Sequence, residues 1–211
     1  MTHRKFQQNH PKPAGFQELS TALTEKAKAG DKAAFEQLVS LFHQEIFRMV
    51  YSRTRSQMDA EDLTQDIFFQ AFTHLATLKE PDRFRPWIFT IAVNRVRDFN
   101  RKKRFLSFFG LSSPSEGGVM PEPSEVSSHS DIEALDELLR VELWNSIRQL
   151  SEKLSSMERE VFFLRFIDDL NIREIAEVLK KSESAIKTHL YRALKKFKED
   201  STLMESLRGD Q

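Results

Sequence analysis

One stretch, residues 86–105, constrains the fold of this chain more than any other. Its sequence, PWIFTIAVNRVRDFNRKKRF, repeats apolar residues at spacings of three and four, which predicts a helix with one buried face. The apolar stripe consists of Ile88, Ile91, Ala92, Val96 and Phe99. The other side carries Thr90, Asn94, Arg97 and Arg101, with Trp87 at its edge. We therefore expect a helix with one side in a core and the other facing a partner.

The second half of this stretch is strongly basic. From Arg95 to Arg104 there are six basic residues and a single acid, Asp98. Lysine and arginine bind nucleic-acid phosphates, and aromatic rings stack on unpaired bases. The helix alone leaves two interpretations open: a nucleic-acid contact and a solvated basic face.

The rest of the chain also predicts helices. Glycine and proline cluster at residues 11–15 and 110–123, and no segment shows the alternation of a strand. We predict an all-α fold: two small helical domains joined by a flexible acidic linker, the second containing a helix-turn-helix. The expected parts are a tail at 1–15, a first domain at 16–105, the linker at 106–133, a second domain at 134–200 and a tail at 201–211.

Composition excludes several classes of protein. The 32 basic and 32 acidic residues cancel, so a nucleic-acid partner must be argued from local charge. The absence of cysteine excludes disulfides and thiolate zinc sites and fits a cytoplasmic protein. No apolar run approaches the ~18 residues of a membrane span. Without a catalytic triad, a metal-ligand cluster or a glycine-rich phosphate loop, we expect no enzyme activity and no cofactor.

Helices are expected in the first domain at 16–28, 32–53, 59–77 and 86–104, with Asp31 and Asp59 as N-caps. In the third, the predicted buried face consists of Leu63, Ile67, Phe68, Ala71, Phe72 and Leu75. The opposite face combines acids and glutamines with one aromatic: Asp62, Gln65, Asp66, Gln70 and Phe69. An exposed Phe among acids favours a protein-binding surface. There are two alternatives. The exposed aromatic is incidental, or Asp59, Asp62 and Asp66 hold a cation.

The linker and the second domain have opposite charges. Between Arg104 and Arg140 there are seven acids and no basic residue, which suits a solvated tether. Helix patterns follow from Ile132, with a capping box at Ser155 and Glu158. The last two predicted helices, near 172–181 and 184–198, have the form of a helix-turn-helix.

The last helix has a basic outer face. Lys180–Lys198 contains seven basic residues against Glu183 alone. Its predicted buried stripe is Ile186, Leu190, Ala193, Leu194 and Phe197. The predicted outer side chains are Ser184, Lys187, Thr188, Tyr191, Arg192 and Lys195. Such a helix fits the DNA major groove, and a structural helical hairpin is the alternative.

The order of these parts resembles the extracytoplasmic-function group of bacterial sigma-70 factors. The matching stretches are AGDKAAFEQLV, DAEDLTQDIFFQAF, FRPWIFTIAVNRVRDFNRKKR and LSSMEREVFFLRFIDDLNIREIAEVLKKSESAIKTHLYRALKKF. The resemblance implies a subunit that binds core RNA polymerase, recognises −35 and −10 promoter elements and opens promoter DNA. Implied partners are the β′ clamp helices, the β flap, promoter DNA and an anti-sigma factor.

The resemblance also implies roles for matching residues. Asp62, Gln65, Asp66, Phe69 and Gln70 would bind the polymerase. A loop at 78–87 would hold a flipped −10 base, with Phe84, Trp87, Thr90, Asn94, Arg97, Arg101 and Lys102 contacting the opened strand. Ser184, Lys187, Thr188, Tyr191, Arg192 and Lys195 would read the −35 element. Two residues depart from the pattern: Lys180 stands where relatives often have Gly, and Pro86 precedes the tryptophan.

Three other functions fit parts of the sequence. A helix-turn-helix regulator with an N-terminal sensor would bind DNA without polymerase. A helical adaptor would use the acidic Phe69 face and bind no DNA. A phosphohydrolase based on Asp59 and Asp66 is the third and weakest alternative.

Overall fold

The computed structural model describes residues 15–108 and 152–199, which are helical and contain no strand. The chain divides into two compact units. Predictions for residues 1–14, 109–151 and 200–211, including most of the linker and the helix around Trp144, lie outside the described residues. None of the described helices is long and apolar enough to cross a membrane.

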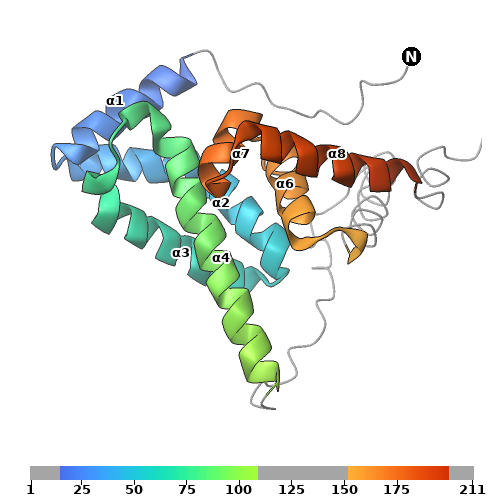
Figure 1. Ribbon diagram of the computed structural model, residues 1–211. Coiled ribbons are helices and arrows are strands. Elements are labelled where there is room, and N and C mark those ends of the chain that lie inside the picture. Colours follow the sequence, from blue (N-terminus) through green and yellow to red (C-terminus); the bar gives the residue numbers. More distant parts are fainter. Residues whose placement is uncertain (1–14, 109–151, 200–211) are drawn as a thin grey trace, which may run out of the picture. The chain divides into compact units, whose positions relative to one another are not determined.

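Within residues 15–108, the first unit consists of four helices, labelled in Figure 1, and two short 3₁₀ segments. Helix α2 packs against α1, α3 and α4, and its buried face includes Leu38, Phe42, Ile46 and Met49. The elements are α1 (Phe16–Lys28), α2 (Lys32–Thr54), α3 (Gln57–His74), η1 (Leu75–Thr77), η2 (Pro81–Arg83) and α4 (Phe84–Phe108).

Local capping rules explain where these helices begin. Asp31 caps α2 as predicted, accepting a 3.1 Å hydrogen bond from the Ala34 amide. The predicted cap of α3, Asp59, is wrong. Ser56 takes that role, because its extended backbone lets its hydroxyl accept from the Asp59 amide at 3.2 Å. The helix therefore begins at Gln57, and residues 75–77 form a separate 3₁₀ turn.

Helix α4 is longer than predicted and turns a wider face to the core. It begins at Phe84 and continues to Phe108, so residues 106–108 are helical and not linker. Its buried residues occur mostly as two neighbours in each successive turn: Phe84, Arg85, Ile88, Phe89, Ala92, Val93 and Val96. The predicted core residues Ile91 and Phe99 are only half-buried, because they flank this face.

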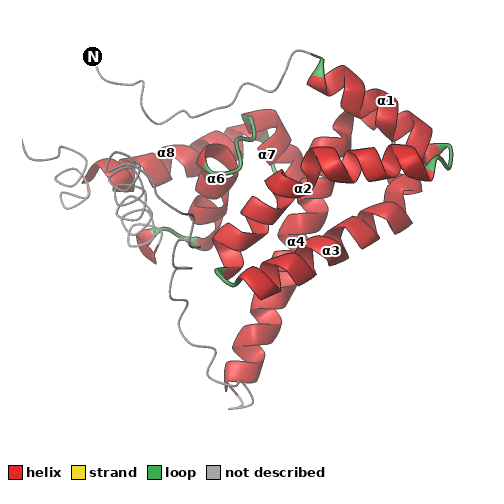
Figure 2. Cartoon of the chain, turned by 180° about the vertical axis from the view of Figure 1, so that it is seen from behind, coloured by secondary structure: helices red, strands yellow, loops and turns green. Residues whose placement is uncertain are grey.

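The described part of the second unit contains three helices, seen from behind in Figure 2: α6 (Ser156–Phe166), α7 (Ile172–Leu179) and α8 (Glu183–Glu199). The predicted capping box is confirmed: the Ser155 hydroxyl accepts from the Glu158 amide at 3.3 Å, and Glu158 accepts from the Ser155 amide at 2.9 Å. Between α6 and α8 lies a small core of Leu154, Phe162 and Ala193. Phe197 extends it, stacking on Phe162 with ring centroids 4.7 Å apart.

Candidate nucleic-acid interface

The start of α4 places Trp87 on a buried aromatic support. The Trp87 ring lies 5.8 Å from Phe84, and Phe84 lies 5.2 Å from Phe42 of α2. Phe42 and Phe84 are completely buried, whereas Trp87 is half-buried. The prediction that Phe84 stacks on a promoter base is therefore wrong for this structure, because its ring is enclosed in the core. Trp87 keeps part of its ring accessible.

The polar side of α4 forms an exposed strip beyond Trp87. Asn94, Arg97, Arg101 and Lys102 are exposed as predicted. Thr90 is half-buried, and its hydroxyl donates a 2.9 Å hydrogen bond to the Pro86 carbonyl. Asn94, Arg97 and Arg101 lie three and four residues apart, so they follow one face of the helix. The strip offers an amide and two guanidinium groups in a row, which suits a polyanionic strand.

The end of α4 adds apolar groups to this strip. Arg101 and Lys102 line a shallow hollow of about 350 Å³ together with Phe105 and Leu106. The Phe105 side chain is 62% exposed. Sequence reasoning kept the basic residues of this turn and missed Phe105 as a site residue, although an aromatic next to arginine and lysine was the available signal.

Helix α3 exposes most of the predicted acidic face. Asp62, Gln65 and Phe69 are exposed, and 69% of the Phe69 surface is accessible. Gln70 is half-buried. The prediction that Phe72 belongs to the buried face is wrong: it is 47% exposed and contacts Phe35 only with its ring edge, at 5.1 Å. This face therefore carries two accessible phenylalanines beside its acids.

Two basic residues of α4 point toward α3. Arg95 donates to Asp66, and the Lys103 ammonium lies 3.8 Å from Asp59. Sequence reasoning counted both cations with the nucleic-acid side of α4. It also left Asp66 with the acidic face alone, because an ion pair between helices 29 residues apart leaves no local signal. Asp66 therefore belongs both to the α3–α4 packing and to the acidic face.

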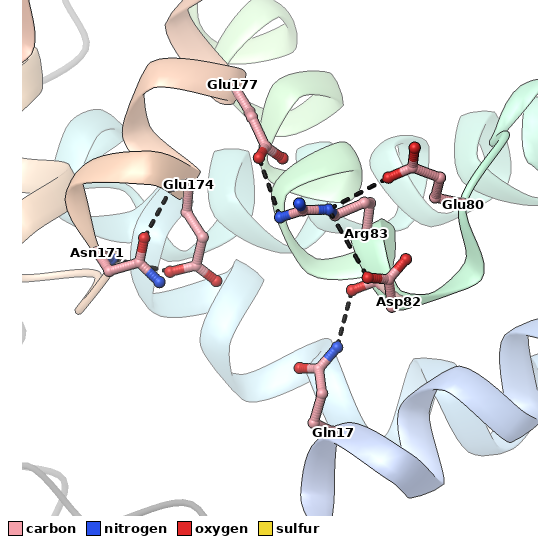
Figure 3. Close-up of polar contacts among 7 residues, drawn as sticks. All are labelled: Gln17, Glu80, Asp82, Arg83, Asn171, Glu174 and Glu177. Atoms are coloured by element: carbon pink, nitrogen blue, oxygen red, sulfur yellow. Dashed lines mark hydrogen bonds and ion pairs between the residues drawn. The ribbon is translucent and has the colours of Figure 1, made fainter. Parts of the chain in front are cut away.

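Both ends of helix α7 have well-defined hydrogen bonds. Asn171 and Glu174 cap α7 reciprocally, with hydrogen bonds of 2.9 and 2.8 Å between side chains and amides (Figure 3). At the other end, the Lys181 amide donates to the Ala176 carbonyl at 2.9 Å and the Lys180 amide to Glu177 at 3.2 Å. These two bonds form a Schellman motif, which requires a left-handed residue at Lys180. Its φ is 52°.

Helix α8 exposes all six side chains predicted to contact DNA: Ser184, Lys187, Thr188, Tyr191, Arg192 and Lys195. The Tyr191 side chain is 70% exposed, and the Thr188 hydroxyl donates to the Ser184 carbonyl at 2.9 Å. Ile186 and Ala193 are buried as predicted. Leu194, predicted to be buried, is 42% exposed, because the contact with α6 is made through Ala193 and Phe197.

An ion pair holds the C-terminal part of α8 against the start of α6. The Lys196 ammonium donates to Glu158 at 2.7 Å and to the Lys153 carbonyl at 3.3 Å. The Lys196 hydrogen bond, together with that of the Ser155 amide, holds the pKa of Glu158 below its ordinary value. Glu158 thus links the capping box of α6 to the orientation of α8.

Comparisons with known proteins agree with this arrangement. The sigma-70 region 2 model matches residues 38–105, and the sigma-70 region 4 model matches residues 144–197. The chain is 31% identical over 189 residues to the ECF RNA polymerase sigma factor BldN of Streptomyces coelicolor, covering 88% of this chain and 68% of BldN. It is 30% identical over 178 residues to SigW of Bacillus subtilis, covering 79% of this chain and 88% of SigW.

A solved structure supports the same relationship. CnrH, in complex with the cytosolic domain of CnrY, matches with a TM-score of 0.60 and 27% identity, covering 92% of this chain and 99% of CnrH. Regions 2 and 4 together imply binding to core RNA polymerase and to promoter DNA. The chain belongs to the extracytoplasmic-function group of the sigma-70 family and is an alternative sigma factor for transcription initiation.

Proposed function

We propose that this sigma factor divides initiation among three surfaces. The acidic face of α3 docks on the β′ clamp helices of core polymerase. Trp87 and the strip of Thr90, Asn94, Arg97, Arg101 and Lys102 hold the unpaired non-template strand of the −10 element. The six outer residues of α8 contact the −35 duplex. The protein acts by binding, without bond chemistry of its own, in the cytoplasm where polymerase and DNA meet.

The observation that carries this proposal is the half-buried Trp87 on its buried Phe84 support, at the head of the exposed strip. A partly accessible aromatic ring packed against a buried one is suited to stack on a base that leaves the duplex. Such stacking contributes ~1–3 kcal/mol per base. The arginines on the same side of the helix then neutralise the phosphates of the following nucleotides.

The acidic face is the best candidate for the polymerase contact. Phe69 is exposed, with Gln65 one turn and Asp62 two turns before it on the same helix. Interfaces centre on aromatic anchors surrounded by polar residues, and this face has that composition. The Asp66–Arg95 ion pair connects it to α4, so docking and strand capture use adjacent sides of one helical pair.

Regulation by a protein partner follows from the same surfaces. CnrH was solved in complex with the cytosolic domain of CnrY. We expect an anti-sigma factor to inhibit this chain in a similar way, by covering the acidic face or the strip and so preventing assembly with polymerase. The linker, which begins after Phe108, and the helix-turn-helix domain predicted at 134–200 complete the scheme.

The experiment is reconstituted run-off transcription with core polymerase and a promoter selected by this sigma factor. Asn94→Ala should reduce permanganate reactivity of −10 thymines at least ~tenfold while leaving the affinity for core polymerase unchanged. Loss of polymerase binding in that variant would show that the faces are wrongly assigned. Specific DNA binding by the chain without polymerase, together with no run-off product, would favour the regulator hypothesis.

A further inference from the structure

Two side chains of α1 donate hydrogen bonds to the backbone of the segment that joins α3 to α4. The Gln17 side-chain amide donates to the Asp82 carbonyl at 2.8 Å (Figure 3). The Lys28 ammonium donates to the Leu78 carbonyl. Gln17 lies at the start of α1 and Lys28 at its end. The helix therefore binds the segment 78–82 at Asp82 and at Leu78, the two ends of that segment.

A third connection runs from α1 to the tryptophan through the core. Phe16 of α1 contacts Phe42 at 5.5 Å, Phe42 contacts Phe84 at 5.2 Å, and Phe84 contacts Trp87 at 5.8 Å. Helix α1 also packs directly against η2. Helix α1 therefore supports both the segment 78–82 and the Trp87 ring that follows it.

The segment itself has little internal structure to fix its position. The Arg83 amide donates to the Glu80 carbonyl at 2.9 Å, and the Leu78 amide donates to Leu75 at 3.1 Å. Lys79, Glu80 and Asp82 are exposed. A binding site that discriminates between bases must hold its backbone to within ~0.5 Å. The buried Leu78 side chain and η2 fix part of the segment, and its exposed residues depend on contacts from outside it.

We propose that α1 is the positioning element for base discrimination at the −10 element, with Gln17 and Lys28 as its positioning residues. This inference rests on the proposed function of the 78–87 segment and Trp87. The match to sigma-70 region 2 begins at residue 38, so it does not include α1. When either hydrogen bond is removed, the segment shifts and the captured base is selected less strictly.

The test is run-off transcription by the full chain with core polymerase. The templates carry each of the four bases at each −10 position. The variants are Lys28→Met and Gln17→Met, which keep side-chain length and remove the donor. The matched controls are Lys26→Met on α1 and Gln37→Met on α2, both exposed side chains. The readout is the ratio of product from the preferred base to product from the poorest base.

Lys28→Met and Gln17→Met should lower this ratio about fivefold, as expected for one lost hydrogen bond, and the controls should leave it unchanged. A variant that merely folds less well reduces both products equally, so the ratio separates positioning from stability. An unchanged ratio in both variants would overturn the proposal.

Trp87→Ala in the same assay separates this inference from the proposed function. If Trp87→Ala lowers the ratio and the α1 variants do not, the role of α1 is wrong and the function of the segment stands. If Trp87→Ala also leaves the ratio unchanged, the assignment of base capture to this segment is wrong, and the inference fails with it.

Discussion

The ring of Phe84 lies 5.8 Å from the Trp87 indole, inclined at 46°, and Phe84 is completely buried while Trp87 is half-buried. The two aromatics stand three residues apart at the start of α4 and have different environments. One belongs to the core and the other to the surface that we assign to promoter opening. Mutation of each residue should therefore affect a different property.

Phe84→Ala should destabilise the first unit by roughly 3–5 kcal/mol, because it removes a fully buried ring from a packed core. Trp87→Ala should lower the thermal stability less and reduce open-complex formation about tenfold. Circular dichroism during heating and permanganate footprinting measure the two effects. Equal losses of stability in both variants would contradict the assigned environments.

Phe69→Ala should weaken binding to core polymerase at least about thirtyfold, the effect of removing an interface anchor worth ~2 kcal/mol. The unfolding temperature should hardly change, because the ring is 69% exposed. Fluorescence anisotropy of labelled protein titrated with core polymerase measures the affinity. Leu19→Ala, which shortens a side chain that is 48% exposed on α1, is the control, and an equal loss in that variant would argue against a specific site.

The outer residues of α8 should separate into readers and phosphate contacts. Arg192→Ala should relax sequence preference at one −35 position by ~1–3 kcal/mol, because a base-edge contact is lost. Lys195→Ala should weaken binding equally across sequences. It should also lower the slope of log affinity against log salt concentration by about one. A −35 promoter library, transcribed at several salt concentrations, tests both. Unchanged preferences in Arg192→Ala would exclude it as a reader.

The ion pair of Glu158 predicts a specific pH dependence. In the unfolded chain the carboxyl titrates near pH ~4.3, and in the folded chain Lys196 holds its pKa lower. Between these two values the unfolded state binds more protons, so stability rises with pH there. The contribution is complete above pH ~4.3 and is lost as the pH falls through the folded pKa.

Lys196→Met should therefore destabilise the second unit at pH 7 and 5, and the difference from the unchanged chain should shrink below pH ~4. Chemical unfolding at each pH, followed by circular dichroism, measures this difference. Lys195→Met is the control, since Lys195 pairs at 3.7 Å with the exposed Glu199. A difference that stays constant down to pH 3 would contradict the role of the Glu158 carboxylate.

Residues governed by local rules were predictable from the sequence. Asp31 and the Ser155–Glu158 pair lie directly before apolar periodic segments and cap as expected. Helix α8 was predictable because its outer residues are polar at every turn. The cap of α3 failed because Ser56 and Asp59 are both good caps, and only the backbone angles at Ser56 decide between them.

Contacts between distant residues were not predictable in the same way. Nothing in the order of residues brings Arg95 to Asp66 or Lys28 to the Leu78 carbonyl. The resemblance placed Phe84 in the loop at 78–87 that would contact the opened strand, whereas α4 begins at Phe84 and the ring is buried in the core. These errors concern which side of a helix a residue faces. The predicted all-α fold class was correct.

Lys180 occupies a position where its side chain is a disadvantage. Its φ of 52° is left-handed, and a Cβ there costs about 1–2 kcal/mol that glycine avoids. The greater freedom of glycine in the unfolded chain offsets part of this gain. Lys180→Gly should therefore raise the unfolding free energy by up to about 1 kcal/mol. Lys180→Ala keeps the Cβ and should give no gain, whereas Gly30→Ala, at φ 99° after α1, should destabilise. Denaturant unfolding of the three variants measures these differences, and equal stability of Lys180→Gly and Lys180→Ala would show that the turn carries no strain.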